Sequence, residues 1–185
     1  MALGASLKLD TPAGDFDSRE WTWTIDCTFC ALESENVDRY EPCITGILYG
    51  PTVRAITIMD GPFPSIYPWD EAQHLNSLTS ALYTPLDKCA TWEDARKVLA
   101  KTTVRAAQQR VEQMMEQLAA YWPDITAQYK IHSWKFGIRA MPRSAAAARI
   151  VDVVRVSDRL IRVRAGKIDA VFQAQALVEE IIGES

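Results

Sequence analysis

Apolar and polar positions alternate in short runs separated by turn residues, a pattern typical of β-strands. These runs cover 21–30, 43–49, 53–59, 75–86, 129–140, 149–156 and 160–164. The tight Gly50-Pro51 connection predicts that 43–49 and 53–59 form a hairpin. The polar stretch 33–41 is typical of a loop.

Helical spacing begins after Thr91, a favourable N-cap followed by acidic residues. Apolar side chains then recur every three or four residues as far as Trp122, and Pro123 ends the pattern. One helix of this length would measure about 45 Å, too long for a compact domain unless it kinks or its ends project. A second amphipathic pattern predicts a helix over 167–182.

The order of strands, long helix, strands and helix predicts the fold class α+β. We expect a mostly antiparallel sheet packed against one long helix, with a carboxy-terminal helix. Residues 1–20 are small and polar and are predicted to form a loose lead-in, while 21–185 are predicted to form one domain. A chain of 185 residues is long enough to bury a core.

The segment 62–69 interrupts the strand pattern. Pro62, Pro64 and Pro68 are predicted to prevent ladder pairing, so that Tyr67 and Trp69 would lie on a stiff, extended lip. Such a lip between two strands is suited to form one wall of a small-molecule pocket. The simpler alternative, which these residues alone favour, is a rigid connection that caps a sheet edge.

Composition and charge exclude some partners. The net charge of −4 argues against a nucleic-acid surface, which requires a basic patch. No apolar run approaches the roughly 20 residues of a membrane span, and the first residues lack the pattern of a secretory signal. We therefore expect a cytoplasmic protein with reduced thiols and with neither a nucleic-acid nor a membrane partner.

Cys27 and Cys30 have the C-x-x-C spacing of zinc and redox sites. There is no second pair to complete a zinc site, and the pair ends a predicted strand instead of opening a helix. We expect thiols without metal, and no metal site elsewhere. The two histidines, His74 and His132, are predicted to be structural.

The glycines bear on nucleotide binding. No two of them are separated by a single residue, so the chain contains no G-x-G-x-x-G dinucleotide fingerprint. The stretch 160–169 predicts a strand, a glycine at Gly166 and a helix start. Free backbone N–H groups there, beside Lys167, would suit an anion or the edge of a cofactor ring. A tight strand-to-helix turn with a solvated lysine explains the same spacing.

Three stretches resemble the carboxy-terminal, substrate-domain half of FAD-dependent oxidoreductases, in the broad glycine oxidase / D-amino-acid oxidase superfamily. They are Thr57-Ile-Met-Asp-Gly-Pro-Phe-Pro-Ser-Ile-Tyr-Pro, Ser77-Leu-Thr-Ser with Tyr83-Thr-Pro-Leu, and Arg162-Val-Arg-Ala-Gly-Lys-Ile-Asp-Ala-Val-Phe. The resemblance extends over about 21–182. It implies an antiparallel substrate domain, which the chain enters from the FAD domain by an early strand. The chain would then return to the FAD domain as a strand, a glycine and a helix beside the flavin.

The resemblance also implies site residues. Gly137-Ile138-Arg139 resembles a Gly-Leu-Arg motif whose arginine lies near the substrate carboxylate. The implied substrate-binding residues are Arg139, Tyr67 and Tyr83, and the implied cofactor-binding residues, at the glycine turn, are Gly166, Lys167 and Ile168. The alanine-rich 145–148 departs from the Asp-Gly-x-Pro turn that usually follows the arginine.

The resemblance implies a split function, because the half that holds most FAD contacts is not in this sequence. FAD is expected only with a partner half, and the chain alone should not hold it tightly. The expected partners are a small-molecule substrate and either an FAD-binding chain or a second copy, met through apolar residues such as Phe172 and Leu177. The alternatives are a cofactor-free small-molecule binder, a non-redox biosynthetic enzyme, or an interaction module.

Overall fold

The computed structural model describes residues 23–26, 37–52, 54–59, 61–142, 151–164 and 171–183. The chain divides into two compact units, which are described separately. Unit 1 takes both ends of the chain, Met1–Phe29 and Ala145–Ser185, and unit 2 takes the middle, Cys30–Ser144. Helices and strands are mixed, the pairing is mostly antiparallel and the last element is a helix, which confirms the predicted α+β class.

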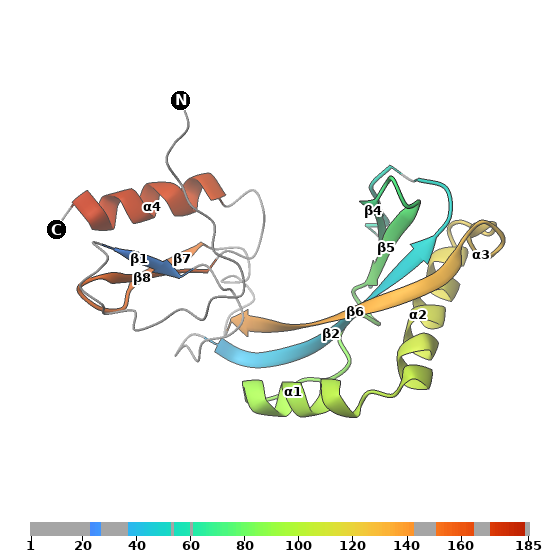
Figure 1. The fold of residues 1–185 in the computed structure, drawn as a ribbon, viewed down its shortest axis with the longest axis horizontal. Coiled ribbons are helices and arrows are strands. Elements are labelled where there is room, and N and C mark those ends of the chain that lie inside the picture. Colours follow the sequence, from blue (N-terminus) through green and yellow to red (C-terminus); the bar gives the residue numbers. More distant parts are fainter. Residues whose placement is uncertain are drawn as a thin grey trace. The chain divides into compact units, whose positions relative to one another are not determined.

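Unit 2 is built on a five-stranded sheet, in the order β3-β4-β5-β2-β6 over the described ranges. Its strands are β2 Val37–Tyr49, β3 Ile56–Thr57, β4 Pro64–Asp70, β5 Leu75–Ser80 and β6 Lys130–Pro142. All four neighbouring pairs are antiparallel. The two longest strands, β2 and β6, lie side by side as a long ribbon (Figure 1).

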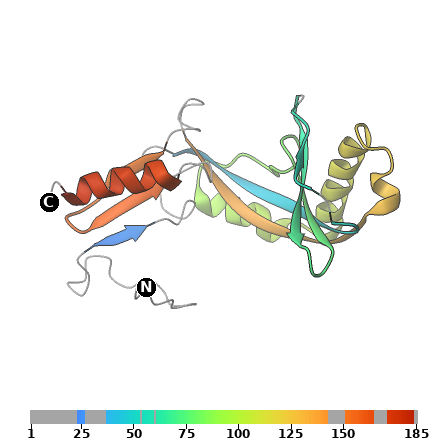
Figure 2. The ribbon, with the colours of Figure 1, turned by 90° about the horizontal axis from the view of Figure 1, so that it is seen from above.

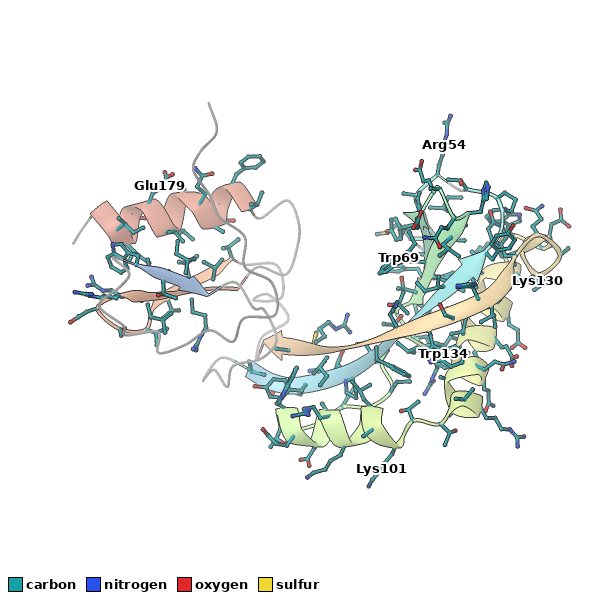
Figure 3. All side chains as sticks on the ribbon, in the orientation of Figure 1. Arg54, Trp69, Lys101, Lys130, Trp134 and Glu179 are labelled. Carbon is teal, nitrogen blue, oxygen red and sulfur yellow. The ribbon has the colours of Figure 1, made fainter. Side chains whose placement is uncertain are left out.

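Three helices of unit 2 pack on one face of this sheet: α1 Trp92–Lys101, α2 Val104–Ala119 and α3 Ile125–Gln128. Ile44 and Leu48 of β2 are fully buried against Val111 and Met114 of α2. Trp134 of β6 lies on the same side (Figure 3). Alternation along the strands sends every second side chain of β2 to the other face. We call that other face, turned away from the described helices of unit 2, the open face.

The predicted long helix is two helices, because the chain leaves helical geometry at Thr102 and Thr103. Both residues have extended backbone angles. The Thr102 hydroxyl donates to the Val98 carbonyl at 2.8 Å, and the Thr103 hydroxyl caps α2 by accepting from the Ala106 N–H. Threonine side chains compete with the helix for backbone hydrogen bonds, so two in succession favour a break. The chain changes direction there (Figure 1).

The predicted hairpin of 43–49 with 53–59 is wrong. β3 pairs with β4, whereas the neighbours of β2 are β5 and β6. The prolines of 62–69 also do not prevent pairing, since Pro64–Asp70 forms β4 between β3 and β5. Pro64 opens the strand, where its carbonyl accepts from the Ile58 N–H, and Pro68 lies beyond the last β3 pair, just before a register shift. A strand tolerates proline at such positions.

Strand β5 begins at Leu75 as predicted but ends at Ser80, before the predicted end at residue 86. The Ser80 hydroxyl accepts from the backbone N–H groups of Leu82 and Tyr83, and the Ser80 N–H donates to the Thr84 hydroxyl. These local hydrogen bonds replace the ladder with a turn.

Unit 1 contains, over its described residues, a three-stranded sheet in the order β1-β8-β7. The strands are β1 Thr24–Asp26, β7 Asp152–Arg155 and β8 Leu160–Arg164. β1 and β8 are parallel, and β7 and β8 are antiparallel. Helix α4, Val171–Gly183, packs on this sheet; Figure 2 shows it alongside β7 and β8, and Glu179 points away from them (Figure 3).

Helix α4 packs on the sheet through the buried Ala174 and Val178. Leu177, which was expected from the sequence to meet a partner, packs beside them. Phe172, expected to meet a partner as well, is 79% exposed. The helix thus buries only part of its apolar stripe against the sheet.

The contact between β2 and α2 supplies a stability test at Gly46. A Cβ there would lie 2.6 Å from Cγ1 of Val111, a stiff side chain that is fully buried. We expect Gly46→Ala to lower the free energy of unfolding by about 1–3 kcal/mol, measured by urea denaturation.

Gly137→Ala is the matched control, because a Cβ at Gly137, in the neighbouring strand, would meet nothing within 4 Å. Its effect should stay within about 0.5 kcal/mol. Equal losses in both variants would show that crowding against Val111 is not the cause.

Candidate functional site

Arg139 of β6 lies directly opposite Glu41 of β2 on the open face. Its Nε and Nη2 both donate to Glu41 Oε2, at 3.2 and 2.5 Å. Arg39, two residues from Glu41 along β2, donates from Nε to the other oxygen, Oε1, at 2.9 Å. Both oxygens of one carboxylate are therefore held by arginines from two adjacent strands.

The three side chains differ in exposure, although they share one face. The side chain of Glu41 is 4% exposed, that of Arg39 is 34% and that of Arg139 is 52%. The carboxylate is thus covered while the guanidinium of Arg139 reaches solvent. We call Arg39, Glu41 and Arg139 the arginine–glutamate cluster.

Opposing effects act on the pKa of Glu41. Burial of the carboxyl raises it, but the hydrogen bonds and charges of Arg139 and Arg39 together outweigh burial, and the net direction is downward. Glu41 is therefore ionised at neutral pH. The hydrogen bonds to Glu41 and then to Asp38 raise the pKa of Arg39.

The geometry leaves one edge of Arg139 open. Glu41 takes the side-on edge, formed by Nε and Nη2. Nη1, which completes the end-on edge with Nη2, has no hydrogen-bond partner within the part of the chain that the structure describes. Because a guanidinium presents two edges that each match a carboxylate, Arg139 can accept a second carboxylate end-on.

Tyr67 lies on the open face but far from Arg139. It is opposite Ser77, which is opposite Ile47, and Ile47 is six residues along β2 from Glu41. At the rise of a β-strand this is about 20 Å. The Tyr67 hydroxyl instead forms a 2.5 Å hydrogen bond with the Thr57 hydroxyl.

Tyr83 lies in the turn after β5 and packs against the helix-side core. Its ring lies 5.9 Å from the guanidinium carbon of Arg110 in α2. The structure therefore does not bring Tyr83, Tyr67 and Arg139 to one place, and a role for either tyrosine in substrate binding stays a prediction.

Several predicted residues lie outside the described residues: Gly166, Lys167, Ile168, Cys27 and Cys30. His74 adopts a φ of 55° in the β4–β5 turn, with its ring edge-on to Tyr49, and His132 is exposed on β6. Among the described side chains, no group of three or more His, Cys, Asp or Glu could hold a metal ion.

Sequence reasoning missed Glu41 and Arg39, because 33–41 was predicted to be a loop. The structure continues β2 back to Val37. The missed signal is the spacing of two: a single residue separates Arg39 from Glu41, so a strand places both on one face, across from Arg139.

None of the helices in the described ranges is both long enough and apolar enough to cross a membrane.

The chain is similar to one curated flavoprotein. Over 134 residues, 72% of its length, it is 28% identical to the FAD-dependent monooxygenase FPY4 of Fusarium mangiferae. The similarity spans 36% of that monooxygenase, about a third of its length. It supports a relationship to FAD-dependent oxidoreductases. No protein-family model and no solved structure matches the chain.

The arginine–glutamate cluster predicts an acid-dependent stability. The pKa of Glu41 lies below the ordinary glutamate value of 4.5 in the folded state. The stability that the ionised Glu41 adds to the fold is thus fully present above the unfolded-state pKa. It is lost as pH falls through the lower folded-state pKa. We expect Glu41→Gln to lower the free energy of unfolding by about 1–2 kcal/mol at pH 7, with the difference from wild type shrinking below about pH 4.5.

Urea denaturation at a series of pH values from 7 to 3 would measure this difference. Glu116→Gln, at an exposed glutamate of α2, is the control and should show no comparable pH-dependent loss. A Glu41→Gln effect that stays constant down to pH 3 would contradict the role of the ionised carboxylate.

Proposed function

We propose that this chain is the substrate-domain half of an FAD-dependent oxidoreductase of the glycine oxidase / D-amino-acid oxidase superfamily. Its substrate is small and bears a carboxylate, which Arg139 binds. The FAD comes from an amino-terminal region that is not part of this sequence. The observation that carries the proposal is the half-exposed guanidinium of Arg139, fixed at one edge by Glu41 and open at the other.

The topology of unit 1 supports the proposal. β1 and β8 are parallel neighbours in one sheet, yet all of unit 2 lies between them in the sequence. Parallel neighbours always require a crossover, and here the crossover is an entire antiparallel domain. An early strand leading out and a late strand leading back is the arrangement that the resemblance implies.

The division of chemistry follows from what this chain contains. FAD, when bound, would accept a hydride from the C–H bond of the carbon that bears the substrate's amine or hydroxyl, while the N–H or O–H proton is released and the C–N or C–O bond becomes a double bond. The sequence lacks the glycine fingerprint for the pyrophosphate, so we assign most FAD contacts to the other half. Gly166, Lys167 and Ile168 remain our proposed contacts to the flavin. Arg139 would orient the substrate through its carboxylate.

A partner follows from the same proposal. Phe172 and Val171 at the start of α4 are 79% and 56% exposed, and Ile25 of β1 is 46% exposed. Val163, by contrast, is buried against α4, and Trp23 and Leu177 pack there too. We propose that the exposed apolar residues meet an FAD-binding chain or a second copy.

A cofactor-free small-molecule binder or non-redox enzyme is the second candidate. One observation favours it: the arginine–glutamate cluster lies wholly within unit 2, so its carboxylate-binding edge requires no residue of the flavin half. Dependence of activity on an added FAD-binding half would separate the two candidates, whereas binding of a carboxylate by this chain would not.

Binding of acetate and benzoate to the purified chain tests the role of Arg139. We expect Arg139→Met to weaken binding of both by about tenfold or more, because a bidentate, charge-assisted pair is lost. Isothermal titration calorimetry measures the affinity, and circular dichroism checks the fold.

The control is Lys135→Met, which removes a cation from the same face of β6, opposite Thr45. Its affinities should stay within about twofold of wild type. No binding by the wild-type chain, or equal losses in the two variants, would contradict a specific carboxylate site at Arg139.

We also expect the purified chain to be colourless and to bind FAD weakly or not at all. The reason is the missing glycine fingerprint, without which no helix N-terminus is presented to the pyrophosphate. Visible absorbance before and after addition of FAD, followed by gel filtration, measures this. Stoichiometric FAD retained on the folded chain would reveal a nucleotide site that the sequence does not indicate.

A further inference from the structure

The two arginines of the arginine–glutamate cluster are not equivalent. Arg39 donates from Nε to Glu41 and from Nη1 to Asp38 Oδ2 at 3.0 Å, so both of its edges face carboxylates. Among the residues that the structure describes, Arg139 donates only to Glu41. The Glu41 carboxylate thus joins Arg39, an arginine that also bonds a second carboxylate, to Arg139, an arginine with an open edge.

We infer that Glu41 is a positioning residue: it holds the side-on edge of Arg139 so that the end-on edge is presented to the carboxylate of a ligand. This inference rests on the proposed function, in which Arg139 binds the substrate carboxylate. It adds Glu41, which neither the sequence motif nor the similarity to the monooxygenase indicates.

Glu41 is suited to this role by its own immobility. It belongs to β2, an interior strand of the sheet, its side chain is 4% exposed, and its second oxygen is held by Arg39. Arg139 belongs to β6, the edge strand of this sheet over the described residues, and its side chain is 52% exposed. An arginine there, without Glu41, would sample many rotamers, and a ligand would have to order it on binding.

A positioning role and a simple charge effect of Glu41 predict opposite changes in carboxylate affinity when Glu41 is neutralised. A negative charge beside a guanidinium repels an incoming anion, so its removal alone would tighten carboxylate binding. Loss of positioning would weaken binding, because the ligand must then immobilise Arg139. The direction of the change therefore identifies which effect dominates.

The experiment compares Glu41→Gln, Glu41→Asp and Asp38→Asn with the wild-type chain, using acetate and benzoate as probes. Titration calorimetry at pH 7 gives the affinities, and the Arg139 Nε–H signal in a nitrogen-15 spectrum, assigned through Arg139→Lys, reports how the guanidinium is held. Asp38→Asn is the matched control: it removes a negative charge three residues from Glu41 without touching Arg139.

We expect Glu41→Gln to weaken both probes by about three- to tenfold and to shift or broaden the Arg139 Nε–H signal. Glu41→Asp keeps the charge but shortens the side chain, and should weaken them too. Asp38→Asn should leave affinities within about twofold of wild type and the signal in place. If Glu41→Gln does not fold, the comparison of Glu41→Asp with the wild-type chain is sufficient to test the inference.

Two results would overturn the inference in distinguishable ways. Unchanged or tighter binding in folded Glu41→Gln and Glu41→Asp, with a shifted Arg139 signal, would show that the carboxylate site exists but needs no positioning by Glu41. No binding of either probe by the wild-type chain, with the Arg139 signal intact, would overturn the proposed carboxylate site and this inference with it.

Discussion

The pairing of β2 with β6 is the constraint on which the rest of unit 2 depends. The register runs without a shift from Arg39↔Met141 to Ile47↔Ser133. Over that length one set of side chains, such as Ile44 and Ile138, faces the helices, and the alternate set, such as Glu41 and Arg139, faces away. Slippage by one residue would exchange the two sets, so the core that fixes the register also fixes the arginine–glutamate cluster.

Strong local patterns made much of the fold predictable. Leu160–Arg164 forms a strand with the predicted bounds, and Thr91 caps a helix as expected. Predictions went wrong where side chains act against a simple pattern. The hydroxyls of Thr102 and Thr103 divide a stretch whose apolar periodicity alone favours one helix, and Pro64 lies at a strand position that does not need its missing N–H.

The candidate site was less accessible to sequence reasoning, because it depends on strand register. A motif match implied Arg139, but no motif indicates that Glu41 lies across from it, since the two residues are far apart in the sequence. Register likewise separates Tyr67 from Arg139 along one face, while the turn after β5 packs Tyr83 against the helix-side core. Which residues share a face, and at what distance, follows from the ladder and not from residue types.

The parallel pair of β1 and β8 also bears on the order in which the chain can fold. Thr24 pairs with Leu160, so this contact must close a loop that contains every residue of unit 2. Unit 2 is continuous in sequence, and pairs such as β4 with β5 connect near segments, so its contacts can begin to form at a smaller entropic cost of loop closure. Folding of unit 2 also shortens the effective loop that β1 and β8 must close. The middle of the chain is thus expected to fold first, and the joining of its two ends to follow.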